Sequence, residues 1–189
     1  MKRYMLSLFI LSGFYCSGIL ATNLSDVADK VISSDQRNTG VEIQLSSDVN
    51  VLQFCIEEVG ELSSQADVFR VFLQTAAALK EQRFDDVALC YENKVQYLLS
   101  GDDFNVIGNE FGMQNVAYTV RMFPEKLRLK DGSQAFETHR GGILYVMNKQ
   151  MSDFHDMNRQ WYLSDILQKR KAIEDSKRPT TFAKDEDVF

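Results

Sequence analysis

Histidine is scarce in this chain, with two residues, His139 and His155, among 189. This argues against a histidine-based metal site, because zinc would then depend on carboxylates or cysteines for its remaining ligands. The sequence also contains no GxSxG, HExxH, CxxC, GxGxxG or P-loop pattern. These absences exclude the enzyme classes that such motifs mark, and they predict no cofactor. Any enzyme here would need catalytic residues dispersed along the chain.

Long apolar runs are also missing, since none reaches the roughly 20 residues that a membrane-spanning helix needs. The N-terminus instead has Lys2 and Arg3, an apolar run over residues 4–15, and Ala21 after small residues. This is the layout of a secretory signal peptide, predicted over residues 1–21 and cleaved near Ala21. The mature chain would then be periplasmic or secreted, while an uncleaved anchor stays open as an alternative.

Basic residues are a minority, with 21 Lys and Arg against 27 Asp and Glu. Loss of the signal peptide removes Lys2 and Arg3, which leaves 19 basic residues against 27 acidic ones and a net charge of −8. Binding to a phosphate backbone depends on clustered Lys and Arg, so nucleic acid is not expected as a partner. An acidic domain favours a basic protein partner through electrostatic steering.

Few cysteines remain after export, because Cys16 leaves with the signal peptide and only Cys55 and Cys90 stay. An even number of cysteines in an oxidising compartment permits one disulfide. Both lie on the more polar phase of alternating strands, Cys55 with Gln53 and Cys90 with Ala88, where an inert core cysteine is less expected. A bridge of this loop length would stabilise the fold by about 3–4 kcal/mol in the chain-entropy model. The alternative is two unpaired, small apolar residues.

The remaining chain of about 168 residues has the size of one domain. Residues 22–50 are polar and weakly periodic, and we expect a weakly structured N-terminal arm there. We expect the ordered domain over residues 51–175 and a solvated tail over 176–189, where charged and polar residues dominate.

The clearest helix is predicted from Ser64, where Asp67 completes a capping box and apolar residues recur at helical spacing. Two alternating runs joined by Glu92-Asn93-Lys94 predict a hairpin. The pattern further predicts a helix from Ser100 to Gly112, a strand over 116–123, a second hairpin around Asp131-Gly132 and a long helix after Gly142. This mixture indicates an α+β fold, with antiparallel β-hairpins packed against two or three amphipathic helices.

The segment around His139 is the strongest candidate for a binding site. Arg140, Gly141 and Gly142 directly precede the predicted helix, whose free N–H groups attract anions. Arg121, on the predicted 116–123 strand, would reach the same place if the two segments were neighbours. A small anionic ligand would suit these five residues. The alternative is that the glycines only turn the chain and Arg140 faces solvent.

The long helix carries an apolar stripe at helical spacing. Its members are Leu144, Met147, Met151, Phe154 and Trp161. With Met157, the methionines of this helix would give an adaptable apolar groove, and the alternative is a core stripe. Trp161 and Tyr162 are candidate interface residues, because aromatic side chains dominate binding hot spots.

The function expected from these patterns is a non-enzymatic, exported domain that binds a partner protein or a small anionic ligand. An accessory, inhibitor or immunity-like protein would have this size and charge. One alternative is a small envelope hydrolase that uses His139 or His155 with Arg121 and Arg140. Another is a carrier of an apolar ligand, which the methionine-rich helix would line.

Overall fold

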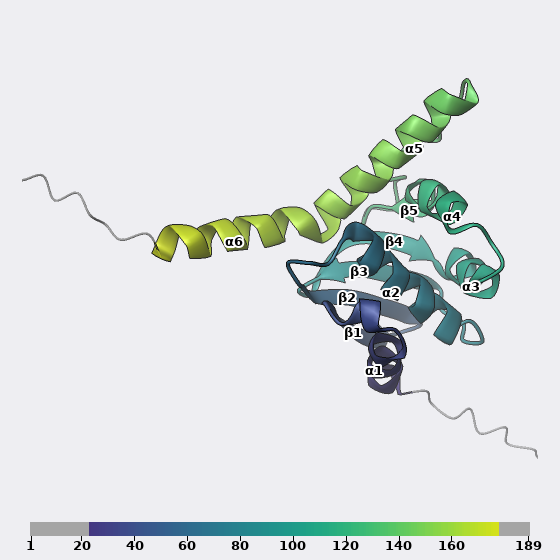
Figure 1. Ribbon diagram of the computed structural model, residues 1–189. Helices are drawn as coiled ribbons and strands as arrows, with labels where there is room; N and C mark the ends of the chain where they lie inside the picture. The colour runs from purple at the N-terminus through teal and green to yellow at the C-terminus, as the bar shows by residue number, and fades with distance from the viewer. Residues whose placement is uncertain (1–22, 178–189) are drawn as a thin grey trace, which may run out of the picture.

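A computed structural model describes residues 23–177 and shows a single α+β domain (Figure 1). The sheet has the order β1-β2-β3-β4-β5, and neighbours are antiparallel except for β2 and β3, which are parallel. The strands are β1 (Val41–Asp48), β2 (Val51–Val59), β3 (Asp86–Tyr91), β4 (Lys94–Ser100) and β5 (Leu127–Arg128). The helices are α1 (Leu24–Ser34), α2 (Gln65–Ala78), α3 (Gly101–Glu110), α4 (Val116–Met122), α5 (Ile143–Asn158) and α6 (Ser164–Lys177). Short 3-10 turns are η1 (Gln36–Asn38) and η2 (Pro124–Lys126), and a π-helical turn, η3 (Arg159–Leu163), joins α5 to α6.

The crossover between the two parallel strands is made by α2, as a parallel pair requires. The expected capping box is present, with the Ser64 hydroxyl accepting from the Asp67 N–H and the Asp67 carboxylate accepting from the Ser64 N–H. Phe69, Phe72 and the other apolar residues of its predicted stripe are buried. The predicted hairpin at Glu92-Asn93 is also confirmed, because both residues have the positive φ that a tight two-residue turn needs.

The core lies between one face of the sheet and the helices. Phe54 on β2 contacts Phe72 of α2 at 5.3 Å and Trp161 of η3 at 5.9 Å between ring centroids. Trp161 and its neighbour Tyr162 are both buried, and the Trp161 indole N–H donates to the Cys90 carbonyl at 3.0 Å. Both residues lie in the π turn η3, where their consecutive side chains face inward. These two aromatics are therefore part of the core and do not form the surface interface expected from the sequence.

Cys55 and Cys90 form a disulfide between β2 and β3. The two residues stand directly opposite each other in the parallel register, with a Cα–Cα distance of 4.4 Å. They alternate with the core residues Phe54 and Leu89 and so point to the other face of the sheet, as their phase in the sequence predicted.

The segment expected as a weakly structured arm belongs to the domain. Its strand β1 pairs with β2 along its whole length, and its helix α1 buries Ala28 and Val31. Asn38, between them, is fully buried and hydrogen-bonded. The domain boundary expected at residue 51 was wrong. The alternating pattern of β1 is short and weak in the sequence, and the strand is stabilised by its pairing with β2. The predicted signal peptide and residues 178–189 of the predicted tail lie outside the described residues, and residues 176 and 177 belong to α6.

The predicted strand over 116–123 is instead the helix α4. Asn115 caps it, because its side-chain oxygen accepts from the Ala117 N–H at 2.9 Å. Val116 and Val120 alternate as in a strand, but their spacing of four also places them on one face of a helix. The predicted second hairpin is reduced to the two residues of β5 and a single bridge between Arg128 and Gln134.

The predicted long helix is confirmed from Ile143, and through η3 it continues to Lys177. It leaves the domain at both ends (Figure 1), with the first half of α5 pointing one way and α6 another. The two C-terminal members of its apolar stripe, Phe154 and Trp161, are buried, and so is Met157 between them. Leu144, Met147 and Met151 are exposed, so the alternative of a core stripe holds for Phe154 and Trp161 but not for these three residues.

Candidate functional site

An open groove of about 880 Å³ lies between α2, α4 and α5. We call it the α2–α5 groove. Its apolar wall is contributed by all three helices and consists of Phe69, Leu73, Val116, Val120, Met151 and Phe154. A shallower hollow of about 470 Å³ continues from Gln74 and Phe111 toward α1. The combined surface is long and apolar, as in sites that take a helix or an elongated ligand.

The floor of the groove is supported by packed aromatic rings. Phe69 of α2 meets Phe154 of α5 edge to face at 5.2 Å and Phe123 at 5.0 Å between centroids. These arrangements are favourable for aromatic pairs. The rim is softer: Met151 is 36% exposed and Phe111, in the turn before α4, is 41% exposed. Methionine adapts to the shape of a bound surface.

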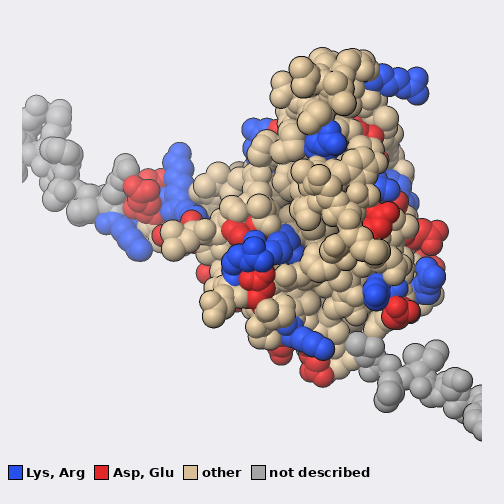
Figure 2. Space-filling view, turned by 45° about the vertical axis from the view of Figure 1, so that its right-hand side comes forward, with Lys and Arg blue, Asp and Glu red and all other residues tan. Residues whose placement is uncertain are grey.

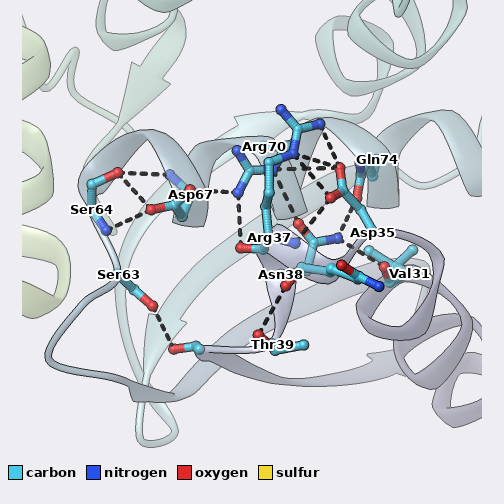
Figure 3. Close-up of polar contacts among 12 residues, drawn as sticks. Val31, Asp35, Arg37, Asn38, Thr39, Ser63, Ser64, Asp67, Arg70 and Gln74 are labelled. Atoms are coloured by element: carbon cyan, nitrogen blue, oxygen red, sulfur yellow. Dashed lines mark hydrogen bonds and ion pairs between the residues drawn. The ribbon is translucent and has the colours of Figure 1, made fainter.

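One end of the groove carries two arginines whose charges are already neutralised (Figure 3). Arg37 forms a two-pronged contact with Asp35, at 3.0 Å from Nε to Oδ1 and 2.6 Å from Nη2 to Oδ2. This hydrogen bonding holds the pKa of the Asp35 carboxyl far below its ordinary value. Arg70 pairs with Asp67. The pKa of the Asp67 carboxyl is also lowered, mainly because it accepts hydrogen bonds from the backbone and side chain of Ser64 and in addition from Arg70.

Buried Asn38 connects this charged cluster to the helices around it. Its amide donates to the Val31 carbonyl at 2.9 Å and to the Gln74 side chain at 2.5 Å, and its oxygen accepts from Arg70 Nε at 3.1 Å. Arg70 also donates to the Arg37 carbonyl at 2.9 Å. Arg70 is therefore held by three hydrogen-bond partners and by a longer ion pair with Asp35. It is a structural residue of the groove end, because binding an anion would require it to give up bonds.

His155 also lines the groove and contacts Gln65, at the start of α2, through Nδ1 at 2.8 Å. Asp153, two residues before His155, is instead bound to His139, with 2.6 Å between Nε2 and Oδ2. Positions 153 and 155 face different sides of α5, so the structure does not bring the two histidines together. Arg159 pairs with Asp156 on the same helix, as expected for a solvated face.

The helices beside the groove are almost uncharged. Residues 111–122 contain one charged residue, Arg121, and residues 141–152 contain one, Lys149. Figure 2 shows few coloured side chains over the upper part of the molecule, where the first half of α5 lies. Exposed apolar side chains fill these segments instead, with Ile143 75% exposed, Leu144 79% and Val116 53%. Such a contiguous apolar surface is typical of an interaction site.

The anion site predicted around His139 is not assembled as expected. Arg121 lies on α4, where its Nε donates to the Ala117 carbonyl and its guanidinium lies over the Tyr118 ring. The strand that would have carried Arg121 to His139 does not exist. Arg140 is exposed, Gly141 has a φ of 140°, and Gly142 is the N-cap of α5 without a side-chain cap.

His139 makes a structural contact within the fold, with Asp153. Its pairing with Asp153 fixes the chain before α5 against the body of that helix, and both side chains are more than four-fifths buried. The Asp153 carboxylate would repel an anion bound close to it. Among the described residues, no three His, Cys, Asp or Glu side chains are grouped to hold a metal ion.

Sequence reasoning identified one wall of the groove through the methionines of α5 but missed the other two. Phe69 and Leu73 fall in the apolar stripe predicted for the helix from Ser64, whose burial the structure confirms, and Val116 and Val120 fall in the predicted strand over 116–123. The signal that could have found the groove is the near absence of charge over residues 111–122 and 141–152, in a chain with 25% charged residues.

None of the helices described over residues 23–177 is both long enough and apolar enough to cross a membrane. In comparisons with protein-family models, with curated proteins and with solved structures, nothing matches this chain.

Proposed function

We propose that this protein is an exported, non-enzymatic binding domain whose α2–α5 groove takes the apolar face of an amphipathic helix from a protein partner. The observation that carries the proposal is an open groove with an apolar wall and no unpaired charge at its arginine end. Helix-in-groove recognition needs these properties, because the bound helix contributes a row of apolar anchors.

A protein segment suits the groove better than a small anion. Arg37 and Arg70 are each paired with a carboxylate, so the net charge of that end is close to zero. The apolar surface also continues beyond the groove, along Leu144 and Ile143, which a small ligand would leave exposed. A hydrolase has less support, because His155 is the only histidine in the groove lining and contacts an amide there.

An apolar small molecule is the second candidate. The volume of about 880 Å³ falls within the range of roughly 300–1,000 Å³ that ligand pockets occupy. Met151 lines the groove, in agreement with the methionine-lined site expected for a carrier. Against it stands the openness of the groove, whose rim residues Phe111, Val116 and Met151 face solvent.

Export is supported by two independent features. The N-terminal residues have the composition of a signal peptide, and Cys55 and Cys90 form a disulfide, which persists in oxidising compartments.

The test is a titration of the mature chain with a fluorescein-labelled helical peptide of about 18 residues, long enough to span roughly 27 Å. The peptide carries leucines at helical spacing and neutral polar residues elsewhere, and a scrambled version is the control. We expect Met151→Glu to weaken binding at least about tenfold, because an unpaired carboxylate would be buried in the contact. Leu167→Glu is the matched control variant, since Leu167 is 54% exposed on α6, outside the groove.

Equal binding by both variants would contradict the groove assignment. A chain that binds an apolar dye such as 1-anilinonaphthalene-8-sulfonate at Met151, but no helical peptide, would favour the small-molecule carrier.

A further inference from the structure

The first half of α5 carries a helix surface that nothing in the described domain covers. Ile143, Leu144, Met147 and Met151 recur at spacings of three and four, so they share one face of the helix. This face, which we call the α5 stripe, continues into the buried residue Phe154. Two of its members, Ile143 and Leu144, are more than 70% exposed.

The stripe and the groove meet at one residue. Met151 is the last member of the stripe and also lines the α2–α5 groove. One chain therefore presents a groove that suits the apolar face of a helix, and a projecting helix with such a face (Figure 1). The stripe cannot bind in the groove of its own chain, because α5 carries the stripe and also forms one wall of that groove.

We infer that two copies of this chain associate, each laying its α5 stripe across the α2–α5 groove of the other, so that the two α5 helices run antiparallel. This assignment rests on the proposed function of the groove and names its partner as a second copy. The contact is isologous: one two-fold arrangement covers both exposed surfaces on both chains.

The apolar area is sufficient for such a dimer. Large apolar side chains present roughly 200 Å² each when fully exposed. At their exposed fractions, the stripe together with Phe111, Met113 and Val116 presents on the order of 800 Å² per copy, comparable to the area per partner of a standard interface.

The charges around the stripe do not oppose the contact. Lys149, the single charge in residues 141–152, lies two positions from both Met147 and Met151 and so on the opposite side of α5, where its Nζ is 5.9 Å from the centroid of the Tyr145 ring. Like charges therefore do not meet between two antiparallel stripes. The contact between His139 and Asp153 holds the preceding chain away from this face as well.

A membrane surface fits the same apolar residues less well. The stripe is convex, but it is continuous with a concave groove of about 880 Å³, which a flat bilayer would leave unfilled. A second α5 fills the groove and covers the stripe in one contact.

The test is sedimentation equilibrium of the mature chain beside Leu144→Glu and the matched control Leu167→Glu, with circular dichroism to check folding. Leu144 is 79% exposed, so its replacement leaves the core unchanged. We expect the unmodified chain and Leu167→Glu to dimerise alike, and the dissociation constant of Leu144→Glu to rise at least tenfold.

A second arm uses a labelled synthetic peptide of residues 141–158. It should bind the Leu144→Glu chain, whose groove is intact, and lose at least tenfold in affinity when Val116→Glu is added to that chain. Binding of this peptide, with loss on Val116→Glu, supports the inference.

Three outcomes would overturn it. A dimer unaffected by Leu144→Glu would place the contact on another surface. A chain that stays monomeric at millimolar concentration but binds the designed leucine peptide would keep the groove function and remove the second copy as its occupant. A monomer that co-sediments with phosphatidylglycerol vesicles, and loses this with Leu144→Glu, would assign the stripe to a membrane surface.

Discussion

Removing the disulfide between Cys55 and Cys90 should destabilise the fold strongly without changing it. The bridge closes a loop with a sequence separation of 35 residues, which contains all of α2. Its two residues are already neighbours in the register of β2 and β3. The native geometry therefore does not depend on the bridge, and its contribution comes mainly from restricting the unfolded chain.

The chain-entropy model gives about 4 kcal/mol for a loop of this length. A domain of this size has a total unfolding free energy of roughly 5–15 kcal/mol, so the bridge is a large fraction of it. At about 2–4 °C per kcal/mol, the double variant Cys55→Ala/Cys90→Ala should melt roughly 10 °C below the unmodified chain.

Urea unfolding followed by circular dichroism measures the difference in unfolding free energy. Reduction with dithiothreitol should destabilise the unmodified chain by a similar amount and leave the double variant unchanged. Reduction breaks the S–S bond but leaves both sulfur atoms in place, whereas the alanine variant removes them. Comparing the two therefore separates the effect of closing the loop from the effect of the small cavity that alanine leaves. A loss below about 1 kcal/mol in both experiments would refute the entropic reasoning.

Two further predictions concern the cluster at the arginine end of the groove. Asn38→Ala should lower the unfolding free energy by about 3 kcal/mol in urea unfolding, because the Val31 carbonyl and Arg70 lose a buried partner, whereas exposed Gln36→Ala should change it little. The Asp35 pKa is lowered in the folded state by its hydrogen bonds to Arg37, so the stabilisation from this carboxylate is present above its ordinary pKa of 3.8 and is lost progressively as the pH falls below that value. Between pH 7 and pH 3 the unmodified chain should lose more unfolding free energy than Asp35→Asn; an equal loss would show that this contact does not drive acid unfolding.

The elements that the sequence predicted well are those with local signals. For α2, the capping pair Ser64 and Asp67 marks the first turn, and the turn at Asn93 determines how β3 pairs with β4. These interactions span three or four residues, so a single sequence contains them in full. For the same reason the α+β class followed from the sequence.

The elements that were missed depend on contacts between distant residues. Val116 and Val120 fit a strand as well as a helix, and the choice depends on the Asn115 cap and on the absence of a strand partner at that place. The stripe of α5 shows which residues are apolar, but burial of Phe154 and exposure of Leu144 depend on where the domain ends. His139 was predicted to belong to an anion site, and its contact with Asp153, 14 residues away on a helix, could not be read from the local sequence.

The single π turn in η3 sets the angle at which the two ends of the long helix face their surroundings. In an α-helix each residue advances the face by about 100°, so removing one residue from η3 would rotate α6 by that angle relative to α5. Lys169 and Arg170 would then turn away from the sheet, and their contacts with Glu92 and with the Val59 carbonyl would be lost. The spacing between Phe154 and Ile166 is thus a fixed length, and insertions or deletions there should be tolerated far less than substitutions of the exposed residues on either side.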